Sequence, residues 1–248
     1  MITVLFVGGH DPTAGAGIDA DRETAAAFGV EARCVVTART DQDGVRVRSL
    51  GAREPDEWLA EARAAGTGIA ALKTGLLPGP RHVRACARLV AELGIPTVVD
   101  PVLAASGGEV FLDDEGVRAL LEELVPHGVV LTPNLPELAR LAGLSAGEGA
   151  ILAADPEART AAARELLDRG AAAVVAKGGH GAEDPVRDLV LAAGAEPVWL
   201  EHARVPGASL HGSGCRFASA LAAGLARGES LPQATRAAGN HVAGLLSG

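Results

Sequence analysis

The segment of this sequence best suited to chemistry is a glycine-rich turn, His211-Gly-Ser-Gly-Cys215, which leads into an apolar stretch with helical spacing. Gly212 and Gly214 allow the amides that follow to converge at a helix N-terminus, where unpaired N–H groups and the helix dipole favour an anion. A phosphoryl group that changes charge during a reaction would be stabilised there. Cys215 would lie in the first helical turn, where the same field favours its thiolate. The segment alone supports an ordinary tight turn equally well, with Cys215 as a small core residue.

Several other catalytic patterns do not fit. The turn lacks the Gly-Lys-Ser/Thr of a Walker phosphate loop, and it lies near the C-terminus, unlike a dinucleotide fingerprint after a first strand. Ser209 and Ser213 stand outside a Gly-x-Ser-x-Gly elbow, which argues against a hydrolase triad. No His, Cys and Asp spacing predicts a transition-metal site. We expect His10, His180 and His211 near the active site, and a surface or packing role for the remaining histidines, which are His82, His127, His202 and His241.

The apolar pattern alternates between the periods of strands and helices. It predicts strands at residues 2–7, 32–38, 69–73, 97–100, 129–131 and 172–176, a hairpin from 186–191 and 196–200, and helices at 16–28, 54–65, 81–93, 113–125, 135–142, 156–167, 214–226 and 231–246. Strands separated by helices indicate right-handed βαβ units. No linker or internal repeat divides the chain. We therefore predict one α/β domain over residues 1–248, with a doubly wound, mostly parallel sheet covered by helices on both faces.

Polar residues and glycines cluster where the predicted strands end. In a doubly wound fold, ligands bind beyond the carboxyl ends of the strands, so residues at these ends should face one crevice. The residues placed there are Gly9, Asp11, Gln42, Lys73, Asp100, Asn134, Lys177 and Gly178. Only two of the 22 basic residues are lysines, Lys73 and Lys177. A lysine retained in such an arginine-rich chain is a candidate for a compact point charge, which arginine does not imitate.

Composition excludes several classes of protein. The formal net charge is −9 and no basic block occurs, which argues against nucleic acid as a partner. No apolar run approaches the length of a membrane helix, and the N-terminus lacks the features of a signal peptide. Three distant cysteines form neither a disulfide framework nor a zinc ribbon. We expect a cytoplasmic protein that binds small molecules and neither nucleic acid nor membranes.

The chemistry-bearing segments, taken in order, resemble a known family. Residues 9–21, Gly-His-Asp-Pro-Thr-Ala-Gly-Ala-Gly-Ile-Asp-Ala-Asp, resemble the N-terminal signature of hydroxymethylpyrimidine (phosphate) kinases, which are members of the ribokinase-like superfamily. The resemblance continues through Thr37-Ala38, Gln42, Lys73-Thr-Gly-Leu-Leu, Val98-Val-Asp-Pro-Val102, Leu131-Thr-Pro-Asn-Leu-Pro-Glu137, Lys177-Gly-Gly-His180, Asp188-Leu189 and His211-Gly-Ser-Gly-Cys215. These motifs cover almost the whole chain, in the family's order and near its spacing. The ordered set is therefore far more specific than any one motif.

The resemblance implies a ribokinase-like fold and an ATP-dependent kinase. Members transfer the γ-phosphate of ATP to the hydroxymethyl group of 4-amino-5-hydroxymethyl-2-methylpyrimidine, and many then phosphorylate the monophosphate, for thiamine synthesis. Cys215 matches the cysteine that stands where most ribokinase-like enzymes have an aspartate base. A thiolate there would take the proton of the acceptor hydroxyl. The amides of Gly212, Ser213 and Gly214 would hold the developing negative charge.

The resemblance also assigns substrate-binding residues. Gln42 matches a residue that hydrogen-bonds the aminopyrimidine, and a carboxamide suits this because it donates and accepts in one plane. Gly9, Asp11 and Asp21 belong to the N-terminal signature around the pyrimidine. Judged from the residues alone, Gln42 is better explained as a polar loop residue. Asp21 is equally consistent with a solvated helix position.

On the phosphate side, the resemblance places Asn134, Lys177 and Gly179 near ATP, and Asp100 and Glu137 near Mg²⁺. Magnesium takes oxygen ligands and keeps several waters, so contact through water fits these carboxylates. Asn134 followed by Glu137 three residues later also fits a helix capping box, and the two roles are compatible.

The sequence departs from the family pattern at two loops. Asp43-Gly44-Val45 follows Gln42 directly, and Leu103-Ala-Ala-Ser-Gly107 is shorter than the family segment and lacks its lysine. A missing cation should weaken the second phosphorylation in particular, because its acceptor is anionic. A pyridoxal or pyridoxine kinase and a non-catalytic nucleotide- or pyrimidine-binding protein therefore remain as alternatives. The family resemblance also implies a homodimer.

Overall fold

The computed structural model describes residues 1–42, 47–105, 107–145, 148–181, 183–205, 207 and 210–247. In this part of the chain nine strands form one sheet, in the order β3-β2-β1-β4-β5-β6-β7-β8-β9. The strands are β1 (Thr3–His10), β2 (Glu31–Gln42), β3 (Val47–Ala52), β4 (Ala71–Thr74), β5 (Thr97–Val99), β6 (Val130–Leu131), β7 (Ala173–Ala176), β8 (Val186–Ala192) and β9 (Val198–His202). The α-helices are α1 (Gly17–Ala27), α2 (Pro55–Ala65), α3 (Pro80–Leu93), α4 (Asp114–Ala119), α5 (Leu135–Leu141), α6 (Gly149–Ala154), α7 (Pro156–Asp168), α8 (Ser213–Ala226) and α9 (Leu231–Ser247).

Strand β1 is the point where the strand order reverses. It pairs in parallel with β2 on one side and with β4 on the other. Its side chains alternate between two cores: Leu5 and Val7 belong to one apolar cluster, and Val4 and Phe6 belong to the other. A strand buried on both faces in this way needs a continuous apolar run, which its sequence supplies. Such a reversal opens a crevice at the carboxyl ends of the neighbouring strands.

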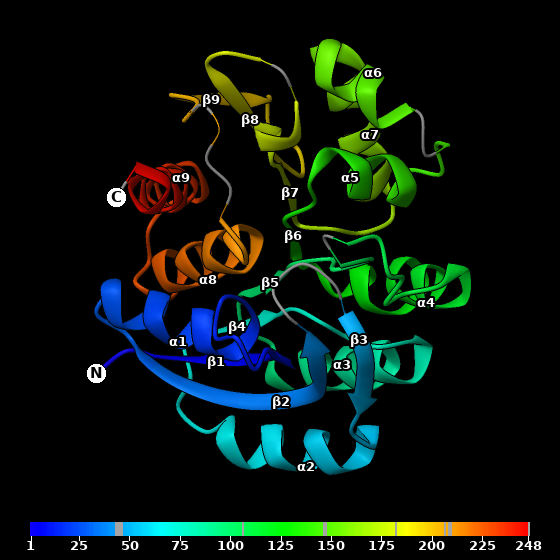
Figure 1. Ribbon diagram of the computed structural model, residues 1–248, viewed down its shortest axis with the longest axis vertical. Helices are drawn as coiled ribbons and strands as arrows, with labels where there is room; N and C mark the ends of the chain where they lie inside the picture. The colour runs from blue at the N-terminus through cyan, green and yellow to red at the C-terminus, as the bar shows by residue number, and fades with distance from the viewer. Residues whose placement is uncertain are drawn as a thin grey trace.

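Helices cover both faces of the sheet (Figure 1). Helices α1, α8 and α9 pack on one face, where Ile18, Phe217 and Leu221 join the cluster of Val4 and Phe6. Helices α2 to α7 supply the other face, where Trp58 is fully buried against the sheet. Figure 1 shows α8 and α9 side by side near α1. The C-terminal helices and the N-terminal signature therefore share one side of the sheet.

The predicted doubly wound α/β fold is confirmed. The pairings from β2 to β7 are parallel, and the outer pairs β2–β3, β7–β8 and β8–β9 are antiparallel. The predicted hairpin near Gly194 is β8–β9, and Gly194 has the positive φ of a turn (72°). In the described residues, no helix is long and apolar enough to cross a membrane.

Some elements differ from the prediction. Strand β3 and helix α6 were not predicted, and the helix predicted at 113–125 is α-helical only through Ala119. A π-helical turn (Leu120–Leu124) and a 3₁₀ turn (Val125–His127) follow it. Pro126 lacks an N–H, so it cannot make the bond that would continue the α-helix.

Candidate active site

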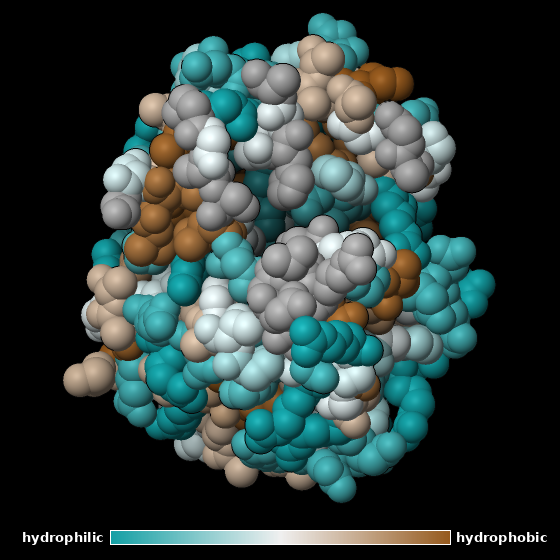
Figure 2. All heavy atoms as spheres, viewed as in Figure 1, coloured by the Kyte–Doolittle hydropathy of each residue, from teal (hydrophilic) through white to brown (hydrophobic). Residues whose placement is uncertain are grey.

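One cavity of about 910 Å³ lies at the carboxyl ends of the central strands. Figure 2, drawn in the same view as Figure 1, shows a hollow near the centre of the molecular surface. Every residue assigned to the site from the sequence, except Gln42, lines this cavity: Gly9, Asp11, Asp21, Asp100, Asn134, Glu137, Lys177, Gly179, Gly212, Ser213, Gly214 and Cys215. Lys73 also lines it, as its strand-end position predicts. Gln42 ends β2, but its side chain lies outside the described residues, so its contact with the pyrimidine stays a prediction. Gly178, expected in the crevice, is not part of the lining.

The glycine-rich turn packs tightly against the N-terminal signature. Gly212 has a φ of 77°, and a Cβ on it would lie 2.3 Å from the carbonyl oxygen of Gly15. A Cβ on Gly214 would lie 3.3 Å from Nζ of Lys177. Both glycines therefore allow close approach, one of backbone to backbone and one of backbone to a cation. The turn thus forms an amide cradle, defined here as residues 212–215, at the start of α8.

The amides of the cradle are not all available to a ligand. The Ser213 N–H donates to the carbonyl of Leu210 at 3.1 Å, which differs from the predicted role of this amide in holding negative charge. Gly214 and Cys215 follow at the second and third positions of α8, where an amide has no acceptor within its own helix. An anion at the cradle would use these two amides and the positive end of the helix dipole, and this role stays a prediction.

Replacing Gly212 with alanine should destabilise the fold and slow turnover, because the new Cβ would overlap Gly15 in addition to adopting a left-handed φ. Gly228 is a matched control: it has a φ of 82°, but a Cβ there meets no atom of the described residues within 4 Å. We expect Gly228→Ala to cost about 1–2 kcal/mol of unfolding free energy from backbone strain alone, with turnover unchanged. Urea denaturation and a kinase assay compare the two. If both variants lost the same amount of stability and kept full activity, the close packing of Gly212 against Gly15 would have no role in the site.

Cys215 contributes a thiol to the site. Burial raises the pKa of its thiol to about 11, although Lys73 and a hydrogen bond with the Gly17 backbone act in the opposite direction. Burial therefore opposes the stabilisation of the thiolate that the helix field was predicted to give, and that stabilisation stays a prediction. The cost of burial is larger than the attraction of the nearby Lys73 ammonium. Cys215 nevertheless lines the cavity, and the residue as a whole is half-buried.

A buried ion pair lies beneath the cradle. Nζ of Lys73 donates to Oδ1 of Asp21 at 2.8 Å, and Oγ of Ser219 donates to the same oxygen at 2.7 Å. Lys73 and Asp21 are 1% and 0% exposed. Asp21 is therefore a buried partner of a lysine, not a solvated helix residue. Ser219 lies one turn after Cys215 on α8, so the pair connects β4 and α1 to the helix that carries the thiol.

A second cluster of charged side chains lies near the cradle, on residues that follow β5, β6 and β7. Nζ of Lys177 donates to Oδ1 of Asp100 at 3.0 Å. Asn134 and Glu137 form the predicted capping box at the start of α5. Burial raises the pKa of Glu137 to about 7, and Asp100 adds to this effect while Lys177 opposes it. For Lys177, burial would lower the pKa, but Asp100 and Glu137 raise it above its usual value.

Asp11 organises the loop between β1 and α1. Its carboxylate accepts hydrogen bonds from the amides of Thr13 (2.9 Å) and Ala16 (3.0 Å), and it pairs with Nε2 of His211 at 2.8 Å. Asp11 therefore has a structural role, and the substrate-binding role predicted for it stays a prediction. The contact with His211 joins the N-terminal signature to the cradle.

Two cavity residues were missed by sequence reasoning. His202 was expected on the surface or in packing, yet it lines the cavity, with Nε2 3.4 Å from Oδ2 of Asp188. The hydrogen bond that the imidazole donates to Asp188 raises the pKa of His202. Arg204 also lines the cavity, two residues beyond β9. Their place just after a strand end was the available signal, but it was applied only to the parallel strands.

The chain is similar to known proteins over nearly its whole length. A family model described as phosphomethylpyrimidine kinase matches residues 11–247. The hydroxymethylpyrimidine/phosphomethylpyrimidine kinase of Streptomyces coelicolor is 37% identical over 246 residues, which are 98% of this chain and 88% of that protein. The Bacillus subtilis protein of the same name is 35% identical over 96% of this chain and 86% of its own length.

Two solved structures illustrate the structural similarity. The pyridoxal kinase from Staphylococcus aureus in complex with ADP has a TM-score of 0.88 and 29% identity, over 99% of this chain and 88% of that one. The phosphomethylpyrimidine kinase from Clostridium difficile has a TM-score of 0.82 and 23% identity, over 99% of both chains. At this identity the second match bears on the fold alone.

Proposed function

This chain belongs to the phosphomethylpyrimidine kinase family, and we propose that it transfers the γ-phosphate of ATP to the hydroxymethyl group of 4-amino-5-hydroxymethyl-2-methylpyrimidine, a step of thiamine biosynthesis. The observation that carries this proposal is that Cys215, the amide cradle and two lysines all line one cavity. An anion site beside a thiol suits an alcohol acceptor and a transferring phosphoryl group.

The reaction follows from the residues around the cradle. The acceptor oxygen attacks the γ-phosphorus, the bond from that phosphorus to the β–γ bridging oxygen breaks, and ADP leaves. The acceptor proton passes to Sγ of Cys215, which must be a thiolate when the proton arrives. Lys73 and Lys177 supply positive charge close to this path, and the amides of the first turn of α8 stabilise the equatorial oxygens.

The carboxylates fit a magnesium ion held jointly with phosphates. Asp100 and Glu137 both line the cavity beside Lys177, and they offer oxygen ligands only. No group of three or more metal-binding side chains occurs in the described residues. Magnesium is commonly bound by one or two carboxylates plus substrate phosphates and water, which is the donor set available here. When bound, the ion would neutralise phosphate charge.

The pKa of Glu137 predicts a pH dependence for magnesium. Its value of about 7 means that the carboxyl gains a proton as the pH falls below 7, and a protonated carboxyl is a poor ligand. The apparent Mg²⁺ affinity should weaken by up to about tenfold per pH unit below 7. Initial rates against Mg²⁺ concentration at pH 6, 7 and 8 measure this.

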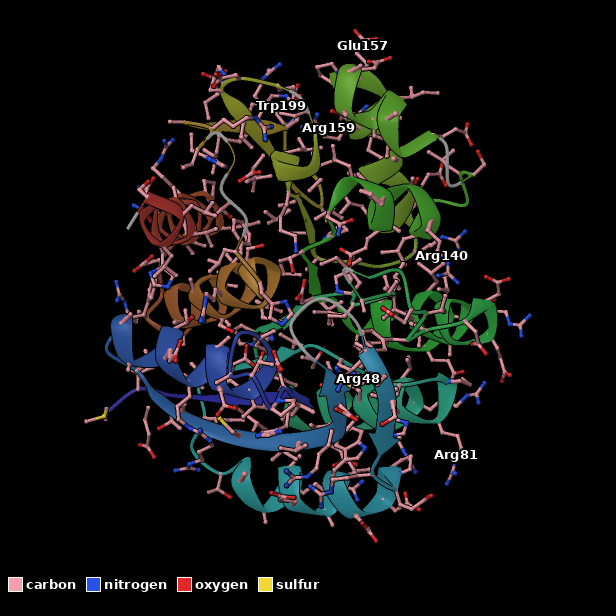
Figure 3. The ribbon with its side chains drawn as sticks, viewed as in Figure 1. Arg48, Arg81, Arg140, Glu157, Arg159 and Trp199 are labelled. Carbon is pink, nitrogen blue, oxygen red and sulfur yellow. The ribbon has the colours of Figure 1, made fainter. Side chains whose placement is uncertain are left out.

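The Glu137→Gln variant should bind Mg²⁺ weakly with little pH dependence. Glu157→Gln provides the control, because Glu157 lies on α7 at the outer edge of the molecule (Figure 3) and outside the cavity lining. This variant should keep the wild-type pH profile. An apparent Mg²⁺ affinity that is the same at pH 6 and pH 8 in the wild type would argue against Glu137 as a ligand.

Product analysis by mass tests the proposed reaction. Purified protein is incubated with ATP, Mg²⁺ and the pyrimidine alcohol, and the mono- and diphosphate are separated. We expect the monophosphate first and the diphosphate more slowly, because the segment 103–107 lacks the lysine that the resemblance would place there. No product from folded protein would overturn the proposal, and nucleotide binding without product would favour a binding protein.

Pyridoxal kinase is the second candidate. It is favoured by the likeness to solved pyridoxal kinases at 28–29% identity over nearly the whole chain. Both acceptors carry a hydroxymethyl group on a heteroaromatic ring, so the same cradle and thiol would serve either. Values of kcat/KM for pyridoxal and for the pyrimidine alcohol, measured side by side, decide which acceptor is the better substrate.

A further inference from the structure

The loop that follows β7 carries two residues assigned to the phosphate side. Lys177 and Gly179 both line the cavity. The Gly178 N–H donates to Oδ1 of Asp188 at 2.8 Å, and a Cβ on Gly178 would lie 2.2 Å from the carbonyl oxygen of Arg187. The start of the loop therefore packs closely against β8. We define residues 177–181 together with Glu183 as the phosphate-side loop.

Arg204 binds the backbone of this loop at three places. Its Nε donates to the carbonyl of Glu183 at 3.0 Å, Nη1 to that of Gly179 at 3.3 Å, and Nη2 to that of Gly181 at 2.8 Å. A planar guanidinium can serve three acceptors in one orientation, whereas a lysine ammonium on a flexible stem cannot reproduce that geometry. The side chain itself lines the cavity.

The far end of the loop is anchored to the core by a second arginine. Arg159 of α7 is fully buried, and its Nη2 donates to Oε2 of Glu183 at 3.0 Å. Its Nη1 donates to the carbonyl of Arg187 at 2.7 Å, and its guanidinium lies 5.2 Å from the ring centre of Trp199 (Figure 3). Arg204 thus holds the loop against a fixed support, so its removal should free the loop without freeing the support.

We propose that Arg204 is a positioning residue for the triphosphate: it fixes the phosphate-side loop so that Lys177 and Gly179 face the nucleotide. This rests on the proposed function, because the phosphate-side assignment of these two residues does. The guanidinium also occupies three carbonyl oxygens that could otherwise turn towards an anionic ligand and repel it. The effect should therefore appear in the binding of ATP and not in the binding of the acceptor.

The Arg204→Ala variant tests the proposal in the full-length protein. We expect the calorimetric Kd and the KM for ATP to rise about tenfold or more, because a small misplacement of binding groups has large effects. The KM for the pyrimidine alcohol should stay unchanged. Hydrogen exchange at the amides of residues 179–181, measured without ligand, should become faster. Arg187→Ala is the matched control: its side chain stacks on Trp199 and is outside the cavity lining, so ATP binding should be retained.

A second variant covers the case in which Arg204→Ala does not fold. Arg204→Lys keeps the charge but not the three bonds, so it should show the same ATP-specific loss in smaller degree. Equal increases in both KM values, or a Kd for ATP and loop exchange both at wild-type level, would overturn the proposal. Calorimetry and hydrogen exchange need no turnover. A failure of the kinase assay in the wild type would therefore count against the proposed function and leave the test of Arg204 intact.

Discussion

Replacing Cys215 with alanine is expected to lower kcat by about 10²- to 10⁴-fold, the usual range for loss of a positioned general base. The thiol lines the cavity in the first turn of α8, beside the cradle where the phosphoryl group would lie. The residues assigned to ATP and Mg²⁺ lie on other elements, so the KM for ATP should change little. A coupled ADP-release assay with the pyrimidine alcohol measures both constants.

The pH profile distinguishes a base from a packing residue. Burial raises the pKa of Cys215 to about 11, so the free protein holds mostly thiol at neutral pH. The thiolate fraction rises by about tenfold per pH unit below that pKa. For the wild type, log kcat/KM should therefore increase with pH from about 7 to 9, and the increase should be absent in Cys215→Ala.

Cys34 provides the matched control for this variant. Burial raises the pKa of its thiol to about 11 as well, but its side chain packs beside the apolar cluster of α1 and α8 and does not line the cavity. Cys34→Ala should keep the wild-type rate and pH profile. If Cys215→Ala kept the wild-type rate, the thiol would have no part in the mechanism, although Cys215 lines the cavity.

The central strands could be predicted from the sequence because they are buried on both faces. The segments that became β1 and β7 are short apolar runs, and each is bounded by glycine. Strand β3 has no such signal: Val47–Ala52 is mostly exposed, and among the described residues it pairs with β2 alone. The sequence of helix α6 (Gly149–Ala154) also gives little indication of a helix, because the helix is short. Among the described residues, no side chain caps its N-terminus.

The candidate site could be predicted where a residue's position in the fold determines its role. Parallel strands bring their carboxyl ends together, so Asp100 and Lys177 meet although 77 residues separate them. The balance of burial against charge could not be predicted, since it depends on packing. Asp21 proved fully buried, and the thiol of Cys215 proved harder to ionise than its place in the helix suggests. His202 was missed because an antiparallel strand, β9, brings it to the cavity.

Replacing Lys73 with methionine should lower the free energy of unfolding by about 3–5 kcal/mol at pH 8, the cost of leaving a buried charge without its partner. The charge left behind is that of Asp21, which is fully buried and whose Oδ2 has no hydrogen-bond partner in the described residues. Arg81→Met is the control, because the pair of Arg81 with Glu54 is exposed on both sides. It should cost about 1 kcal/mol or less in urea denaturation.

The loss of stability in Lys73→Met should shrink at acid pH. Burial raises the pKa of Asp21, and removal of the ammonium takes away an opposing attraction, so the pKa rises further. A carboxyl with a raised folded-state pKa stabilises the fold while protonated, and this contribution is lost as the pH rises through that pKa. The variant should therefore be closer to the wild type at pH 5 than at pH 8. A loss of equal size at both pH values would mean that the pKa of Asp21 in the folded variant is not raised into this pH range.

The double variant Lys73→Met/Asp21→Asn separates stability from catalysis. It removes both charges, and the amide oxygen can still accept from Ser219, so most of the stability should return. Activity should not return, because the positive charge of Lys73 lowers the pKa of the Cys215 thiol by more than the Asp21 carboxylate raises it, and both are removed. We expect the rise of kcat/KM with pH to move to higher pH in the double variant. Wild-type kinetics in a stable double variant would show that the lysine serves packing alone.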